Sequence, residues 1–223
     1  MPHFISTTTN YLITTNYKVM YSTMTRQERL RLCPGRELLR MTYARRMRLC
    51  SAKHYLIVRN PYHRLISFYK NKFQTNPLKT TTLWSYGKWQ YSQRIFFPYL
   101  NITRETPATE IKDKLLSVSF DHFIQTLPNV YTLDGHLTPQ HQIRFIRHQG
   151  LSFGQIKFTS VLKMESPQDM DYLGQELYLD LSKKHNQTGT AELNDYFTSS
   201  LVRIVNDLYR EDFVRYGYSF QAC

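Results

Sequence analysis

The sequence predicts a single α/β domain whose mainly parallel sheet is flanked by helices. The run YLIV at residues 55–58 is short and continuously apolar, which is typical of a strand covered on both faces. Residues 63–73, HRLISFYKNKF, then show the spacing of a helix that crosses back over this strand, so the two form half of a βαβ unit. With 223 residues, of which 41% are hydrophobic, the chain can build one core.

The N-terminal part of the chain predicts strands followed by basic helices. Residues 4–24 are rich in Thr, Tyr and Ile and predict one or two strands with a polar loop. RQERLRL at residues 26–32 predicts the start of a helix, which Pro34 and Gly35 interrupt. Residues 37–50 place apolar side chains at helical spacing with arginines between them, so we expect a basic amphipathic helix with its arginines in solvent.

Three later segments complete the expected domain. Residues 74–102 contain aromatic residues and few acids, and predict a long connection or insertion whose aromatic side chains form a flap or simply pack. Residues 117–128 predict a helix with Asp121 near its start and Pro128 after its end. Residues 191–215 repeat apolar side chains at the spacing of an amphipathic helix.

The charge balance favours an anionic partner. Lysine and arginine number 29 against 17 for aspartate and glutamate, which gives a net charge of +12. Nucleic acid, a membrane surface and a phosphate- or sulfate-bearing small molecule all fit this charge. The three cysteines show no CxxC spacing, and the N-terminus resembles neither a secretory signal nor a membrane anchor. We therefore expect a cytoplasmic protein with no transmembrane segment.

An arginine follows the buried run directly, where α/β sheets bind their ligands. Arg59 comes at the carboxyl end of the expected strand, and ligands of open α/β sheets lie in the crevice outside these ends. Pro61 suits the first turn of the next helix, on which Arg64 and Ser67 follow. A guanidinium and a hydroxyl that converge on a helix start can bind a phosphate group.

The string R-N-P-Y-H-R-L-I-S-F-Y at residues 59–69 resembles the 3′-phosphate-binding segment of the sulfotransferases that use 3′-phosphoadenosine-5′-phosphosulfate (PAPS), R-[DN]-P-x-x-R-x-x-S-x-[YF]. Residues 134–140, DGHLTPQ, resemble the D-x-H-x-x-P-Q segment of the Golgi carbohydrate sulfotransferases of the chondroitin and dermatan type, which have bacterial relatives. FTSVLKMES at residues 158–166 and LYREDFVRYGY at residues 208–218 resemble later segments of that family. The resemblance implies one sulfotransferase domain over residues 1–223, of the P-loop nucleotide-binding type, with an insertion or flap at about 74–102.

These enzymes also carry a P-K-x-G-[ST]-[ST] loop after their first strand, whose lysine and backbone amides hold the 5′-phosphosulfate. The nearest match here is KVMYST at residues 18–23, which lacks the proline and the glycine and has one extra residue. The resemblance therefore assigns this role to Lys18, Ser22 and Thr23, with Thr25 and Arg26 as alternatives.

The resemblance also implies roles for the other site residues. Lys18 would neutralise charge on the bridging oxygen, while Arg59 and Ser67 would hold the 3′-phosphate of PAPS. No metal is expected, because such a transfer depends on positioning and charge stabilisation. His136 is the first candidate for the base that takes the proton of the acceptor, and a nucleotide-binding or loop-stabilising role for it stays open. The alternative bases are His54, His63 and Glu37, and the expected acceptor is a carbohydrate or a glycolipid.

Three other readings compete with this one. A basic nucleic-acid-binding protein would explain the charge and the tyrosines but not the ordered motifs, and we expect no nucleic-acid partner. A nucleotide-dependent kinase would need a G-x-x-x-x-G-K-[ST] loop, which the sequence lacks. A degenerate relative without catalytic activity would retain the scaffold and bind a glycan, and the altered lysine loop fits that reading.

Overall fold

A mixed sheet of five strands organises the first part of the chain. The computed structural model describes residues 2–48, 51–74, 89–148, 151–181 and 193–222. The strand order is β3-β1-β2-β4-β7, and these strands are β1 (His3–Ser6), β2 (Tyr11–Thr15), β3 (Leu30–Leu32), β4 (Lys53–Val58) and β7 (Ser160–Lys163). Strand β4 pairs in parallel with β2 and β7, whereas β1 is antiparallel to both β2 and β3. The predicted parallel sheet is therefore confirmed for its central part, and an antiparallel pair extends one edge.

The chain divides into two compact units. One unit comprises Met1–Asn60 and Gln140–Gln187, and we call it the sheet unit because it contains all five strands. The other unit comprises Pro61–Pro139 and Thr188–Cys223, and we call it the helical unit. The boundary after Asn60 falls between β4 and the helix that the sequence predicts behind it, so the two halves of the R-N-P motif belong to different units.

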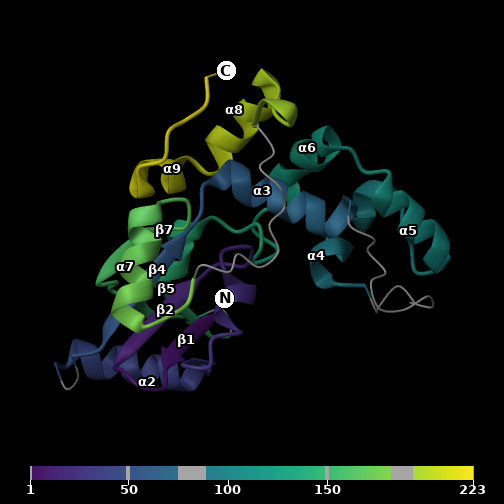
Figure 1. The fold of residues 1–223 in the computed structure, drawn as a ribbon. Coiled ribbons are helices and arrows are strands. Elements are labelled where there is room, and N and C mark those ends of the chain that lie inside the picture. The colour runs from purple at the N-terminus through teal and green to yellow at the C-terminus, as the bar shows by residue number, and fades with distance from the viewer. Residues whose placement is uncertain (1, 49–50, 75–88, 149–150, 182–192, 223) are drawn as a thin grey trace. The chain divides into compact units, whose positions relative to one another are not determined.

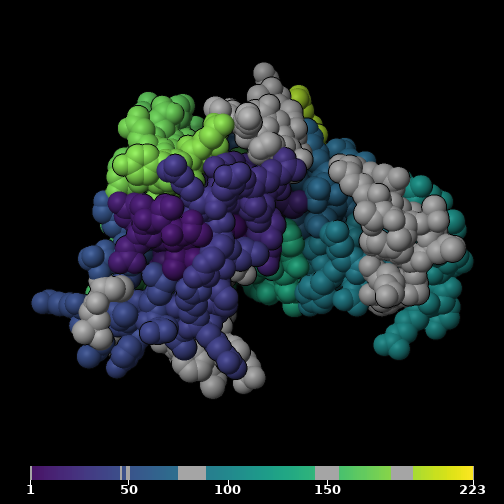
Figure 2. Space-filling model, turned by 60° about the horizontal axis from the view of Figure 1, so that its bottom comes forward, coloured from purple at the N-terminus to yellow at the C-terminus, as the bar shows by residue number. Residues whose placement is uncertain are grey.

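Helices of the sheet unit cover both faces of its sheet. Neighbouring residues of a strand point to opposite faces, and both Leu12 and Ile13 of β2 are buried. Ile13 packs in one apolar cluster with Leu173 of α7 (Pro167–Leu177), and Leu12 packs in another with Leu38 of α2 (Gly35–Arg46). In the space-filling view the purple N-terminal strands lie between the green residues of α7 and the violet residues of the α2 region (Figure 2).

The sheet unit contains further short elements. These are α1 (Tyr21–Met24), the 3₁₀ helix η4 (Gln140–Arg144), and the two-stranded sheet of β5 (Phe145–His148) and β6 (Leu151–Gln155). The predicted helix at residues 26–32 is wrong, because this stretch ends in strand β3. Leu30 pairs with Ser6 of β1 and is buried there. The sequence of this segment fits a helix or a strand, and pairing with the edge of the sheet makes it a strand.

The helical unit packs around aromatic side chains, and its helices are labelled in Figure 1. Its helices are α3 (Pro61–Tyr69), α4 (Tyr91–Arg94), α5 (Ala108–Leu116), α6 (Phe120–Val130), α8 (Ser199–Leu208) and α9 (Arg210–Tyr216). A π-helical turn, η1 (Lys70–Gln74), continues α3, and the described residues of the unit also form the 3₁₀ helices η3 (Phe97–Leu100) and η5 (Leu193–Asp195). Phe68 of α3 and Phe123 of α6 stack with ring centroids 5.5 Å apart at the centre of the core.

Two predicted helices of this unit differ from the structure. Pro128 lies inside α6 rather than after it, in its last turn, where only one backbone hydrogen bond is lost. The hydroxyl of Ser119 caps the start of this helix by accepting from the backbone N–H of His122. The single helix predicted at residues 191–215 is broken at Tyr209, which has a φ of −112° and separates α8 from α9.

The predicted insertion at 74–102 lies partly outside the described residues, which resume at Trp89. In the described part, Trp89, Phe96 and Phe97 are buried in the core of the helical unit. These three aromatic side chains therefore pack and do not form a flap. None of the helices in the described ranges has the length and apolar character needed to cross a membrane.

Candidate functional site

The carboxyl ends of β2, β4 and β7 lie side by side in the sheet unit. The three strands are parallel and adjacent, with Thr15 opposite Ile57 and Val58 opposite Lys163. The segments that follow them therefore meet at one edge of the sheet, which is where open α/β sheets bind ligands. The first of these segments, Asn16–Met20, we call the lysine loop.

The lysine loop connects β2 to α1 and contains two residues with left-handed backbone conformation. Lys18 has a φ of 67° and Met20 a φ of 54°. Counted from Lys18, Met20 stands where the glycine stands in P-K-x-G-[ST]-[ST]. The sequence lacks that glycine, yet the backbone takes the conformation that glycine favours, which strains a side chain with a Cβ.

Side chains at the end of β2 hold this loop. The buried Thr15 hydroxyl donates to the carbonyl oxygens of Asn16 and Val19. The Asn16 side-chain oxygen accepts from the backbone N–H of Tyr17 at 2.8 Å. Because Thr15 and Asn16 are both buried, the loop begins from a fixed position at the sheet edge.

Arg59 links the end of β4 to the lysine loop. Its Nη1 donates to the carbonyl oxygen of Lys18 at 2.9 Å, and its Nε lies 3.9 Å from the Glu165 carboxylate. Glu165 follows β7 and also accepts from the backbone N–H of Asn60 at 2.9 Å. The three strand ends are thus joined through one guanidinium and one carboxylate.

Gln140 fixes the backbone of Arg59. Its side-chain oxygen accepts from the Arg59 N–H at 2.9 Å, and its side-chain N–H donates to the Arg59 carbonyl at 2.7 Å. Gln140 is fully buried. Through these bonds Gln140, the last residue of the D-x-H-x-x-P-Q segment, supports the backbone at Arg59.

Ser22 and Thr23 follow the lysine loop in the short helix α1. Thr23 is buried, and its N–H donates to the Met20 carbonyl at 3.0 Å, while Ser22 is half-buried. The hydroxyl of Thr25, one of the alternatives, donates to the carbonyl oxygens of Tyr21 and Ser22. Lys18, Ser22, Thr23 and Arg59 therefore all belong to the sheet unit, where the Arg59 guanidinium contacts the Lys18 carbonyl.

His136 lies in a segment of the helical unit, Asp134–Pro139, that we call the histidine loop. The Asp134 carboxylate accepts from the His136 backbone N–H at 2.8 Å and contacts its ring Nδ1 at 2.6 Å. Burial by itself would raise the pKa of Asp134, but the hydrogen bonds and charge of His136 outweigh it and hold this pKa below its usual value. Asp134 is therefore ionised near neutral pH and orients the imidazole.

A buried arginine holds the histidine loop in place. Arg64 of α3 is fully buried and donates to the carbonyl oxygens of Thr138 at 2.9 Å and Leu137 at 3.4 Å. Its guanidinium carbon lies 5.3 Å from the ring centroid of Tyr209, whose hydroxyl also donates to Leu137 at 2.7 Å. The second arginine of the R-N-P-x-x-R motif thus supports the other motif of the chain rather than a phosphate.

Ser67 lies on α3 and is buried in the helical unit. Arg59 belongs to the sheet unit. The predicted phosphate site made by Arg59 and Ser67 therefore takes one residue from each unit, and it stays a prediction. The same holds for the pairing of Lys18 with His136.

The alternative bases have other surroundings. His54 of β4 is fully buried and shares the Thr14 hydroxyl at 2.7 Å, and burial lowers its pKa to about 3. Glu37 of α2 forms two hydrogen bonds with Arg31, which lower the pKa of Glu37. His63 is half-buried in the first turn of α3.

Sequence reasoning missed the bond between Asp134 and His136 and the contact of Arg64. The first had a local signal, since an aspartate two residues before a histidine can accept from its backbone N–H as an Asx turn. The second had none, because Arg64 and Thr138 are 74 residues apart.

The helix-covered sheet with a parallel central part defines an α/β protein. The chain matches the sequence model described as "Sulfotransferase family" over residues 5–219 and belongs to this family. Its members are transferases that move a sulfuryl group from a nucleotide donor to an acceptor. No curated protein and no solved structure matches the chain.

Proposed function

We propose that this protein transfers the sulfuryl group of PAPS to a hydroxyl group of a carbohydrate or glycolipid. The observation that carries the proposal is the position of Arg59 in a chain of the sulfotransferase family. Arg59 is held by Gln140 at the end of β4 and contacts the lysine loop through its guanidinium.

The charges at the strand ends fit an anionic donor. Lys18, Arg59 and Lys163 bring three cations to this edge, against the carboxylates of Glu165 and of Asp169, which caps the Lys163 N–H at 2.7 Å. When bound, PAPS would supply the sulfuryl group and a bisphosphate leaving group. Lys18 would then stabilise the charge on the leaving oxygen, with Ser22 and Thr23 on the same phosphate.

The 3′-phosphate of the nucleotide would be held by Arg59 and Ser67. A guanidinium provides several N–H donors in a fixed plane, and a serine hydroxyl adds one more, which suits the oxygens of a phosphate group.

His136 would act as the general base. A hydrogen bond from Nδ1–H to Asp134 selects the tautomer in which Nε2 carries the lone pair, so Nε2 can accept the proton of the acceptor hydroxyl. The hydroxyl oxygen then forms the bond to sulfur as the bond between sulfur and the leaving oxygen breaks. The ionised Asp134 stabilises the imidazolium that results.

Residues 134–140 match the D-x-H-x-x-P-Q segment of the chondroitin- and dermatan-type sulfotransferases. This match is the reason for proposing a carbohydrate acceptor of the kind that those enzymes modify. The net charge of +12 suits an anionic saccharide. The expected cytoplasmic location and the absence of a metal stay predictions.

A second function, glycan or nucleotide binding without catalysis, is favoured by one observation. Met20 stands at the place of the glycine in the lysine loop, and its side chain restricts how closely a phosphate approaches the backbone there. A scaffold with intact Arg59 and an altered loop would retain affinity for the nucleotide product and lose transfer.

Isothermal titration with adenosine 3′,5′-bisphosphate tests donor binding. We expect the Arg59→Ala variant to bind about 10- to 150-fold more weakly, since a charged hydrogen bond contributes about 1.5–3 kcal/mol. The exposed Arg36→Ala in α2 is the matched control and should bind like the parent protein. Equal affinity in Arg59→Ala, or single-stranded DNA binding without bisphosphate affinity, would overturn the proposal.

Transfer of labelled sulfate from PAPS onto a panel of glycans and lipids tests catalysis. Lys18→Ala and His136→Ala should abolish transfer, and Asp134→Asn should lower it at least about 100-fold while bisphosphate affinity persists. Bisphosphate binding with no transfer to any acceptor would instead support the noncatalytic relative.

A further inference from the structure

The sheet unit contains a hollow of about 420 Å³ that the proposed transfer does not use. It is lined by Thr9, Tyr11, Tyr172, Gln175, Glu176 and Tyr178. Tyr11 begins β2, whereas the lysine loop follows the other end of the same strand. The hollow therefore lies at the amino end of the parallel strands and is separate from the proposed donor site.

Tyr178 is held at the rim by an unusual backbone conformation. It is the C-cap of α7 with a φ of 53°, a position where glycine or asparagine is favoured. Its side chain is 70% exposed, so the ring is not retained for burial in the core. The Tyr178 ring is therefore exposed at the rim of the hollow.

The charges around the hollow are already balanced. The Glu176 carboxylate accepts from the Tyr11 hydroxyl at 2.9 Å and forms an ion pair with Lys53, and these hydrogen bonds lower the pKa of Glu176. Lys53 also lies over the Tyr11 ring at 5.4 Å, and the Arg29 guanidinium lies over the Tyr178 ring at 5.7 Å. Cations of the protein itself thus contact both rings, which disfavours a cationic ligand.

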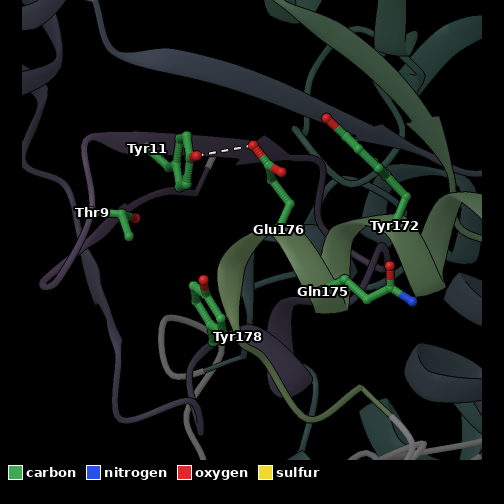
Figure 3. A pocket seen from close by; sticks show the side chains of 6 residues that line it. All are labelled: Thr9, Tyr11, Tyr172, Gln175, Glu176 and Tyr178. Carbon is green, nitrogen blue, oxygen red and sulfur yellow. Dashed lines mark hydrogen bonds between the residues drawn. The ribbon is translucent and has the colours of Figure 1, made fainter.

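The remaining groups suit a neutral polyhydroxylated ligand. Figure 3 shows Thr9, Tyr11 and Glu176 around one opening, with the Tyr178 hydroxyl directed toward the space between them. Phenol, hydroxyl and carboxylate oxygens can exchange hydrogen bonds with sugar hydroxyls. The volume lies within the range of small-molecule sites.

We propose that the hollow bounded by Thr9, Tyr11, Glu176 and Tyr178 binds a neutral saccharide unit. This site lies at the other end of β2 from the lysine loop, and the binding proposed here does not depend on transfer activity. The hollow would hold a glycan at the amino ends of the parallel strands, while the carboxyl ends of the same strands would hold the nucleotide.

Saturation-transfer difference NMR on the full chain tests the proposal, with maltotetraose, cellotetraose and chitotetraose as probes and choline as the cationic comparison. We expect transfer to the ring protons of at least one oligosaccharide. Tyr178→Gly removes the ring and retains the left-handed backbone, and it should weaken that binding at least tenfold. Tyr43→Ala, which removes an exposed tyrosine of α2, is the matched control and should bind like the parent protein.

Two further variants keep the result clear. Tyr178→Asn, which also tolerates the left-handed conformation, replaces Tyr178→Gly if thermal unfolding shows the glycine variant to be destabilised. Arg59→Ala should lose bisphosphate affinity and retain oligosaccharide binding, which separates this site from the donor site. The proposal is overturned if no oligosaccharide shows transfer, if transfer is unchanged in the folded Tyr178 variant, or if choline binds more tightly than all three.

Discussion

The lysine loop and the histidine loop would carry the two halves of the proposed chemistry, and the protein holds them in different ways. The lysine loop has two residues in left-handed conformation and is supported by side chains of β2 and by Arg59 at a sheet edge. The carbonyl oxygens of the histidine loop accept hydrogen bonds from the fully buried Arg64 and from the phenol of Tyr209.

The comparison shows two ways to fix a site residue. The lysine loop begins at a strand end and is held by Thr15 of its own strand and by Arg59 at the end of the neighbouring strand, and its backbone is strained at Lys18 and Met20. A loop between helices has no such edge, so its carbonyl oxygens need donors from a distant segment. Loss of stability should accordingly be larger for changes beneath the histidine loop than for changes within the lysine loop.

The largest effect is expected for Arg64→Ala. This change leaves the Thr138 carbonyl without its donor and opens a space under the loop, which should cost about 3 kcal/mol of unfolding free energy. Urea unfolding measures it, with the exposed Arg203→Ala of α8 as the control. A loss below about 1 kcal/mol would show that the histidine loop does not depend on this guanidinium.

Acid should destabilise the sheet through two histidines, His3 and His54, next to strand β2. Burial lowers the pKa of His54 to about 3, with smaller contributions from Arg45 and His3, and burial also lowers the pKa of His3 to about 4. Both rings contact the Thr14 hydroxyl at 2.7 Å. Because the folded pKa values lie below the unfolded value of about 6.5, their contribution is complete above that pH and is lost progressively below it.

Between pH 7 and pH 5 His54 alone should account for about 2 kcal/mol. Urea unfolding at both pH values measures this, and His54→Gln should reduce the difference. His122→Gln, at an exposed position of α6, should leave it unchanged. An identical pH difference in parent and His54→Gln would mean that His54 is not held neutral.

Gln140→Leu should separate Arg59 from its support. The change removes both hydrogen bonds to the Arg59 backbone inside the protein, which should cost about 2 kcal/mol and weaken bisphosphate binding. Gln140→Glu keeps the acceptor for the Arg59 N–H but buries a carboxylate against the Arg59 carbonyl oxygen, so a larger loss than in Gln140→Leu is expected. Urea unfolding and titration of both variants check the order, and a neutral Gln140→Leu would contradict it.

The smallest effect concerns strain in the lysine loop itself. Met20→Val places a β-branched residue at a φ of 54°, whereas Met20→Gly relieves the strain and loses some packing of a half-buried side chain. The glycine variant should therefore be more stable than the valine variant by about 1–2 kcal/mol. If thermal unfolding shows the two to be equal, the loop does not hold Met20 in the left-handed region.

Much of the sheet could be predicted from local patterns. The continuous apolar run in β4 and the helical spacing in α2 each contain enough information within a few residues, and both elements were confirmed. The strand β3 could not be predicted, because three residues beside charged neighbours form a strand only when β1 offers an edge to pair with. At the break between α8 and α9, the hydroxyl of Tyr209 donates to Leu137, 72 residues away, and this contact has no local signal in the sequence.

The sequence alone determined the strand that ends in Arg59, the excess of positive charge and the ordered motifs, because each depends on neighbouring residues or on composition. Only the tertiary structure decided that Arg64 supports the histidine loop, that Gln140 holds the Arg59 backbone, and that three tyrosines surround a hollow at the other end of β2. These contacts join segments far apart in the chain, and their distances depend on how the core packs, which no local pattern records.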